Sequence, residues 1–302
     1  MKIFATLPAV HRDKQLRTVA EHPLVDALRF NTGMKSHLTP IETLDSYLTA
    51  AKGKEFWVDL KGRQLRITQW AVPGFGDIVL NHEIEVNLPT EIYFRREEKS
   101  IIRKIQKNKI YVDPPPPKAV GAGQAINIPD DSLRIKGYFT EEDLEYIEAA
   151  SKLGIKNFLL SFVEEEQDIL RLTDLIPDAR IIAKIESRKG MQLIQNSYSN
   201  FKIKPTLMAA RDDLYINIGE DKTDILPALK LILEKDPSAI VASRLFTSLE
   251  EHSEVSLSDL SDFYLMKSLG YNACLLSDGL CSGEKSFLNT MSVLKQFETK
   301  KH

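Results

Sequence analysis

The sequence predicts an α/β protein whose core is a (β/α)8 TIM barrel, with a small β-rich insert after strand 3. Short runs rich in β-branched and aromatic residues alternate with amphipathic helical stretches, which is typical of a parallel sheet covered by helices. Eight such runs occur, and eight is the number of strands that a closed barrel requires. One connection is much longer than a single helix needs, and it accommodates the insert.

The eight predicted barrel strands lie at residues 3–7, 27–31, 56–60, 157–162, 180–186, 206–210, 239–243 and 273–277. The helices between them carry recognisable end signals. Thr140 and Asp143 have the spacing of a capping box, and Ser256 and Asp259 repeat it before a stop at Gly270. Neither a G-x-G-x-x-G sequence nor a Walker-type loop is present, so a Rossmann or P-loop nucleotide site is not favoured.

The insert lies between the third strand and Thr140. Its predicted short strands are residues 83–88, 91–96, 100–106 and 109–112, and a proline-rich strut (113–117) and a glycine-containing hinge (121–123) follow them. We therefore assign residues 1–68 and 136–302 to the barrel and residues 69–135 to the insert, which could act as a lid.

One hairpin of the insert is locally basic. Residues 95–109 contain seven Lys or Arg side chains against Glu97 and Glu98. Two interpretations are open: the hairpin is a solvated surface, or it is a lid that attracts phosphates.

The composition limits the possible partners and location. Apolar residues make up 43% and charged residues 27% of the chain, and the net charge is -3, so nucleic acid is not an expected partner. No apolar stretch approaches the roughly 20 residues needed to span a bilayer, and His11, Arg12 and Asp13 interrupt the first apolar run. We expect a cytoplasmic protein with no membrane partner, in which Cys274 and Cys281 are buried thiols without chemistry.

Charged and polar residues follow five of the predicted strands, at the ends that meet over one mouth of a barrel. They are Arg29 and Asn31; Asp59, Lys61 and Arg66; Lys184 and Glu186; Arg211, Asp212 and Asp213; and Ser243 and Arg244. Lys184 and Glu186 are two residues apart on one strand, so both can face the mouth. This pair brings a cation beside a carboxylate.

Glu186 and Asp213 end consecutive strands and offer the hard oxygen ligands that Mg²⁺ or Mn²⁺ accepts. Two acids at strand ends are often merely structural or solvated. Here they coincide with Lys184 and Arg29, and two cations near a metal form a clamp for a transferring phosphoryl group or a developing enolate. The coincidence favours a functional site.

These residues resemble the pyruvate kinase family. Residues 182–186, I-A-K-I-E, are similar to the family's K-I-E motif, and residues 207–214, L-M-A-A-R-D-D-L, to its M-V-A-R-G-D-L segment. Further similar segments follow in the same order: 27–31 (R-x-N), 58–66 (D-L-x-G-P-x-I-R), 160–163 (L-S-F-V) and 241–243 (V-A-T). The resemblance covers most of the barrel and also implies an insert after the third strand.

The resemblance implies catalytic and metal-binding roles for five residues. Glu186 and Asp213 would bind Mg²⁺ or Mn²⁺, and Lys184 would stabilise the phosphoryl group and the enolate oxygen. Arg29 would hold phosphate. Ser243 replaces the family's threonine but keeps the hydroxyl, which would help to deliver a proton to the enolate.

The resemblance also implies cofactor contacts. Arg66 would assist at the nucleotide side, where ADP or ATP is the co-substrate. Asn31 and Asp59 match ligands of a K⁺ ion, but Gly33 and Leu60 replace two hydroxyl-bearing ligands found in many members. A K⁺ requirement is therefore open.

The chain departs from the family pattern at several points. Asp212 stands where the family has the glycine of R-G-D, whose amide meets the substrate carboxylate, and a negative charge there disfavours a carboxylate in the usual pose. Gly279 stands where the family has a glutamate, and Thr247 replaces another. The insert is short, and the sequence ends at His302, so we expect no regulatory carboxyl-terminal domain.

Three functions are compatible with these residues. The first is a pyruvate kinase-like phosphotransferase that uses Mg²⁺, a nucleotide and phosphoenolpyruvate, pyruvate or a related enol acid. The second is a Mg²⁺-dependent lyase or aldolase that acts through the enolate of a 2-oxo acid. The third is a catalytically degenerate barrel with a binding or regulatory task. The expected assembly is a homodimer.

Overall fold

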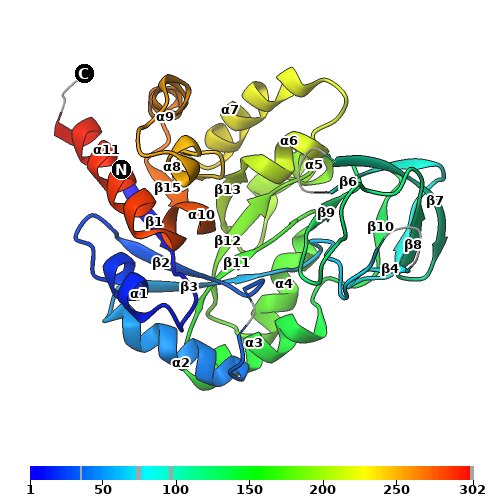
Figure 1. Ribbon diagram of the computed structural model, residues 1–302, viewed down its shortest axis with the longest axis horizontal. Coiled ribbons are helices and arrows are strands. Elements are labelled where there is room, and N and C mark those ends of the chain that lie inside the picture. Colours follow the sequence, from blue (N-terminus) through cyan, green and yellow to red (C-terminus); the bar gives the residue numbers. More distant parts are fainter. Residues whose placement is uncertain (35, 73–75, 95–97, 300–302) are drawn as a thin grey trace.

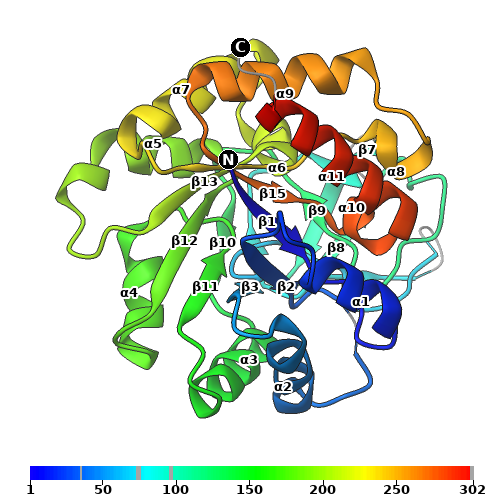
Figure 2. The same ribbon diagram turned by 90° about the vertical axis from the view of Figure 1, so that its left-hand side faces the viewer.

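The protein is described by a computed structural model that covers residues 1–34, 36–72, 76–94 and 98–299. The barrel strands are β1 (Lys2–Thr6), β2 (Ala27–Asn31), β3 (Glu55–Leu60), β11 (Asn157–Leu160), β12 (Arg180–Ile185), β13 (Thr206–Ala210), β14 (Ile240–Ala242) and β15 (Ala273–Leu276). They pair in parallel and close in the order β1, β15, β14, β13, β12, β11, β3, β2 (Figures 1 and 2). Each overlaps one predicted run, so the predicted barrel is confirmed.

Helices surround the strand ring, as Figure 2 shows along the barrel. They are α1 (Asp13–Ala20), α2 (Pro40–Ala51), α3 (Glu141–Lys152), α4 (Glu166–Leu175), α5 (Arg188–Asn196), α6 (Arg211–Asn217), α7 (Ile225–Lys235), α8 (Ser248–Glu251), α9 (Leu257–Leu269), α10 (Asp278–Ser282) and α11 (Glu284–Thr299), with 3₁₀ turns at Tyr198–Asn200 and Lys222–Asp224. Thr140 and Asp143 form the predicted capping box of α3. Ser256 caps α9, and Gly270 ends it with φ 112°. None of the described helices combines the length and apolar composition that crossing a bilayer requires.

Successive side chains along each barrel strand point to opposite faces of the sheet. One set of side chains packs outward against the helices, and the other fills the barrel. The interior set includes Phe4, Ala27, Trp57, Leu159, Ile182, Met208, Ile240 and Ala273. Two residues further along β2, β3 and β12 the same face carries Arg29, Asp59 and Lys184. An apolar layer therefore underlies a charged layer at the carboxyl end of the barrel.

The chain between β3 and α3 forms additional β structure beside the barrel, on the right in Figure 1. Its strands are β4 (Ile78–Val79), β5 (Ile84–Glu85), β6 (Thr90–Phe94), β7 (Glu98–Gln106), β8 (Lys109–Val112), β9 (Ile126–Asn127) and β10 (Arg134–Ile135). Five of them form an antiparallel sheet in the order β4, β8, β7, β6, β9, and β5 pairs with β10. Ile92, Phe94 and Ile102 belong to a hydrophobic cluster of this region's own. The domain boundaries at 68/69 and 135/136 stay a prediction.

Three described cations of the basic hairpin pair with acids of the same region, namely Lys99, Arg103 and Lys109. Lys99 contacts Glu91, and Lys109 Nζ lies 2.8 Å from Asp77 Oδ2. Arg95 and Arg96, which end the predicted strand 91–96, and Glu97 of the basic run lie outside the described residues. The local pairing favours the solvated-surface interpretation of the hairpin.

Asp143 connects the start of α3 to the loop that leaves β3. Its side chain is fully buried. Oδ1 accepts a hydrogen bond from Lys61 N at 2.8 Å, and Oδ2 accepts from Gly62 N at 3.1 Å and Thr140 N at 3.0 Å. One carboxylate thus satisfies three backbone donors and fixes the loop that begins the insert.

We expect Asp143→Ala to destabilise the fold more than Thr140→Ala does. The alanine at 143 leaves one buried and two partly buried backbone donors without this partner, at up to about 1–3 kcal/mol each in the unrelaxed limit, whereas loss of the Thr140 cap costs about 1 kcal/mol. Urea unfolding of both variants measures the difference. Equal losses would show that Asp143 acts only as a helix cap.

Candidate active site at the barrel mouth

A cavity of about 440 Å³ opens at the carboxyl ends of the barrel strands. Barrel residues form most of its wall, and Gln124, Ala125 and Asn127 contribute from the insert region. The lining contains all eight residues that the sequence proposed for the site: Arg29, Asn31, Asp59, Arg66, Lys184, Glu186, Asp213 and Ser243. Its size is within the range of small-molecule sites. The structure therefore brings the eight residues together, and their roles stay a prediction.

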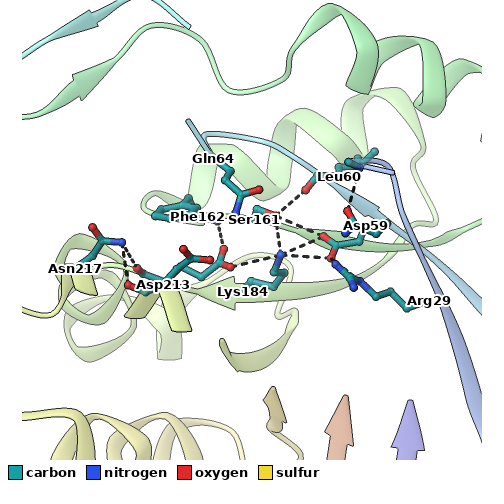
Figure 3. Close-up of polar contacts among 12 residues, drawn as sticks. Arg29, Asp59, Leu60, Gln64, Ser161, Phe162, Lys184, Asp213 and Asn217 are labelled. Atoms are coloured by element: carbon teal, nitrogen blue, oxygen red, sulfur yellow. Dashed lines mark hydrogen bonds and ion pairs between the residues drawn. The ribbon is translucent and has the colours of Figure 1, made fainter. Parts of the chain in front are cut away.

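The carboxylate of Asp59 contacts two buried cations. Arg29 Nη2 lies 2.6 Å and Arg29 Nε 2.8 Å from Asp59 Oδ2, and Lys184 Nζ lies 3.3 Å from both Asp59 oxygens. Lys184 also donates to Ser161 Oγ at 2.8 Å. Figure 3 shows Lys184 between Asp59 and Asp213. Arg29, Asp59 and Lys184 come together because side chains alternate along the strands and all three lie on the interior face of the barrel.

These contacts keep the three groups charged. Burial alone would lower the pKa of Lys184, but Asp59 and Glu186 raise it above its ordinary value. Burial would raise the pKa of Asp59, but Lys184 and Arg29 lower it. Only opposite charges at close range overcome desolvation in this way. The ammonium of Lys184 is therefore a fixed positive charge in the cavity wall.

Glu186, directly after β12, and Asp213, in the first turn of α6, line the same cavity. Glu186 Oε1 lies 3.4 Å from Lys184 Nζ, and Glu186 Oε2 accepts from Phe162 N at 2.7 Å. Burial, with Asp213 contributing and Lys184 opposing, raises the pKa of Glu186 to about 7. Burial also raises the pKa of Asp213. Two carboxylates crowded in a buried site bind a divalent cation readily, because the cation removes their repulsion.

Asp213 accepts a hydrogen bond from a residue that the sequence analysis did not identify. Asn127, on β9 of the insert region, donates from Nδ2 to Asp213 Oδ1 at 2.9 Å. Its own Oδ1 accepts from Asn217 Nδ2 at 2.7 Å. Asn127 is 8% exposed, so the amide is fixed between the insert region and the barrel. This contact links the insert to a proposed metal ligand.

The donor set fits a Mg²⁺ or Mn²⁺ ion that keeps substrate and water ligands. Among the described residues no cluster of three or more His, Cys, Asp or Glu side chains forms a complete cage. Glu186 and Asp213 supply two carboxylates, and Mg²⁺ is commonly held by one or two carboxylates plus substrate oxygens. An open two-carboxylate site is therefore suitable for an ion that also contacts a ligand.

A K⁺ requirement stays a prediction, because the oxygens that the resemblance assigns to the ion already have protein partners. Both Asp59 oxygens contact Lys184, and Asn31 Oδ1 accepts from Gly33 N at 3.0 Å. Asn31 Nδ2 donates to Asp278 Oδ2 at 3.1 Å. The oxygens of Asn31 and Asp59 that the resemblance would assign to K⁺ are thus already used by the protein.

Arg29 and Arg66 reach the cavity but are bound by protein groups. Arg29 Nη1 contacts Asp278 Oδ2 at 3.3 Å in addition to Asp59. Arg66 donates to Gln64 Oε1 at 2.8 Å and to the carbonyl of Gly123 at 2.8 Å. A phosphate at Arg29 would have to displace Asp278, whose side chain is 45% exposed and also accepts a hydrogen bond from Asn31.

Two glycines at departures from the family pattern create space for neighbouring side chains. A Cβ on Gly33 would lie 2.8 Å from Arg66 Nη1, so glycine there admits the guanidinium. A Cβ on Gly279 would lie 2.4–2.6 Å from the carboxyl group of Glu250. Glu250 lines the cavity and accepts from Ser277 Oγ at 2.6 Å. The acid absent at position 279 is thus replaced in space by Glu250 of α8.

Sequence reasoning missed Asn127, Asp278 and Glu250. Asn127 follows the glycine hinge and carries no charge, so neither periodicity nor charge marked it. Asp278 follows the eighth strand and could have been found by the strand-end rule. Glu250 reaches the cavity from a short helix that the sequence pattern did not indicate. The described lysines of the basic hairpin do not line the cavity.

The sequence model described as "Pyruvate kinase, barrel domain" matches residues 100–284, which is more than half of the 302-residue chain. The chain belongs to the pyruvate kinase family. The family's barrel architecture agrees with the closed ring of eight strands, and the match includes Lys184, Glu186 and Asp213.

Individual members of the family are similar over much of the chain. The pyruvate kinase of Borreliella burgdorferi is 24% identical over 290 residues, which are 86% of this chain and 60% of that protein. The pyruvate kinase of Methanocaldococcus jannaschii is 26% identical over 213 residues, 65% of this chain and 46% of that protein. That of Lactobacillus delbrueckii is 28% identical over 174 residues, 54% of this chain and 28% of that protein. This chain therefore spans 60% or less of the length of these relatives.

We expect the metal-free chain to lose stability as the pH rises from about 4.5 to about 7. The raised pKa of Glu186 means that the folded chain retains a proton which the unfolded chain releases near pH 4.5. The loss from this group is roughly 3 kcal/mol over the window. Urea unfolding with a chelator at several pH values measures the slope. Glu186→Gln should flatten it, and an unchanged slope would contradict the raised pKa.

Proposed function

We propose that this chain is a Mg²⁺-dependent phosphotransferase that acts on phosphoenolpyruvate, pyruvate or a related enol acid, with ADP or ATP as co-substrate. The relatives are named pyruvate kinase. The observation that carries the proposal is the position of Lys184, whose Nζ lies 3.4 Å from Glu186 Oε1 in a cavity that Asp213 and Arg29 also line. A fixed ammonium beside two carboxylates suits a substrate oxygen that becomes an anion.

The side chains of this cavity have distinct proposed tasks. Lys184 stabilises the charge that spreads over the phosphoryl and enolate oxygens, because its ammonium is preorganised by Asp59 and Ser161. Glu186 and Asp213 hold the divalent ion, which when bound supplies Lewis-acid stabilisation of those oxygens. Arg29 binds phosphate once its ion pair with Asp278 is broken. Ser243 helps to deliver the proton to the enolate carbon.

The lyase or aldolase remains a second candidate because of how the arginines are bound. Arg29 is held by Asp59 and Asp278, and Arg66 by Gln64 and Gly123. A reaction through the enolate of a 2-oxo acid needs only the metal pair and Lys184, so it does not require these arginines to be released. A homodimeric assembly and a cytoplasmic location stay predictions from the sequence.

We expect the purified chain to form pyruvate from phosphoenolpyruvate only when ADP and Mg²⁺ are both present. Lys184→Ala should lower kcat by roughly 10²–10³-fold, because it removes an electrostatic group at the reacting oxygens. Lys156→Ala is the matched control, since Lys156 forms an exposed ion pair with Asp178 outside the cavity. A lactate dehydrogenase-coupled assay measures the rates.

Two outcomes would contradict the phosphotransferase. Exchange of the pyruvate methyl protons without nucleotide, lost in Lys184→Ala, would support the lyase or aldolase instead. Absence of both activities together with absence of Mg²⁺ binding would support a degenerate barrel. Strict ADP dependence would exclude the second candidate.

A further inference from the structure

Arg244 lies on the cavity wall beside the proposed metal ligands. It follows Ser243 after β14, and both residues line the cavity, as does Asp212. Arg244 Nε donates to Asp212 Oδ1 at 2.7 Å. The guanidinium carbon lies 4.7 Å from the centroid of the Tyr215 ring. Asp212 and the Tyr215 ring thus hold the Arg244 guanidinium in place. Asp212 directly precedes Asp213, a proposed metal ligand.

The backbone that carries Arg244 is in an unfavourable conformation. Ser243, Arg244 and Phe246 have φ values of 65°, 55° and 53°, and non-glycine residues rarely adopt this region. Arg211 stabilises the turn, because its guanidinium donates to the Ser243 carbonyl at 2.7 and 3.1 Å. Asp262 in turn binds Arg211 at 2.6 Å. A strained turn that a partly buried ion pair maintains at a cavity indicates a functional constraint.

The geometry of Arg244 leaves a binding edge for a ligand. The contact with Asp212 uses Nε, and a guanidinium held in this way retains its Nη1/Nη2 edge for a second, bidentate partner. The side chain is 41% exposed, whereas that of Asp212 is 18% exposed. The arginine can therefore be reached from the cavity while its anchor stays largely covered.

The charge of the pair favours a monoanion. Arg244 and Asp212 together are neutral, so a dianionic phosphate placed at this edge would lie close to the Asp212 carboxylate with little net attraction. A carboxylate carries half that charge, and its planar oxygens match the guanidinium edge. The pair is thus more suitable for a carboxylate than for a phosphate.

We propose that Arg244, held by Asp212, is a specificity-determining residue that binds the carboxylate of a small 2-oxo or enol acid. This inference rests on the proposed function and deepens it. Asp212 excludes a carboxylate from the end of α6, and Arg244 provides the replacement contact on the adjacent wall. The substrate oxygen that develops negative charge then points toward Lys184.

Binding of oxalate in saturating Mg²⁺, measured by isothermal titration calorimetry, tests the proposal. Arg244→Ala should weaken oxalate binding by roughly 10–100-fold, the loss expected for a hydrogen-bonded charged pair. Arg244→Lys keeps the charge but not the planar edge, so it should give an intermediate loss. Arg17→Ala is the matched control, because Arg17 is an exposed arginine paired with Asp13 on α1, and it should bind oxalate as the unaltered chain does.

A double variant and a second anion sharpen the test. Arg244→Ala removes a positive charge beside Asp212, so Asp212→Gly in the same chain should recover part of the lost oxalate affinity. Inorganic phosphate, which has no carboxylate, should bind the unaltered chain and Arg244→Ala equally.

The failures of this inference and of the proposed function are distinguishable. If the unaltered chain binds Mg²⁺ and oxalate but Arg244→Ala binds oxalate equally well, the carboxylate role of Arg244 is overturned and the proposed function stands. If phosphate weakens as much as oxalate, Arg244 is a general anion contact and the carboxylate specificity is overturned. If the unaltered chain binds neither Mg²⁺ nor oxalate, the proposed function itself fails.

Discussion

The carboxylate of Asp59 holds two buried cations at the mouth of the barrel, and the arrangement of the site depends on it. Arg29 and Lys184 both contact its oxygens, and its negative charge offsets the free-energy cost of burying the two cations. Lys184 in turn lies between Asp59 and Glu186. Across the mouth of the barrel, the Lys184 ammonium thus lies between the carboxylates of Asp59 and Glu186. The contact with Asp59 therefore determines where this positive charge is presented to a ligand.

A second constraint joins the insert region to this charged layer. Asn127 donates to Asp213 and accepts from Asn217, so a residue from β9 orients a carboxylate in the first turn of α6. Asp143 fixes the other end of the connection, where the chain leaves β3. Displacement of the insert would therefore release a hydrogen bond at the proposed metal ligand. This coupling gives the insert a physical means to influence the site.

Much of the fold and most of the proposed site could be predicted from the sequence, because they follow from local periodicity. The strands were recognisable as β-branched runs, the starts of α3 and α9 as capping signals, and Lys184 and Glu186 as neighbours on one face. The contacts of Asn127 and Glu250 could not be predicted, since they depend on how the insert region and the short helix α8 pack on the barrel. Likewise, Asp212 was predicted to repel a carboxylate, but its pairing with Arg244 appears only in three dimensions.

Three departures from the family pattern are each matched by a neighbouring side chain. Gly33 makes room for Arg66, and Gly279 makes room for Glu250. Asp212 is balanced by Arg244 across the cavity wall. Each of these three changes is thus accompanied by a neighbouring side chain that occupies the space or balances the charge.

We expect Glu186 and Asp213 together to bind one divalent ion beside Lys184. Electron paramagnetic resonance of added Mn²⁺ tests it most directly, because free and bound Mn²⁺ give different signals. The account predicts one bound Mn²⁺ per chain, displaced by Mg²⁺, and loss of this binding in Glu186→Gln and in Asp213→Asn. Binding of Mn²⁺ that is unchanged in both variants, or no binding by the unaltered chain, would contradict it.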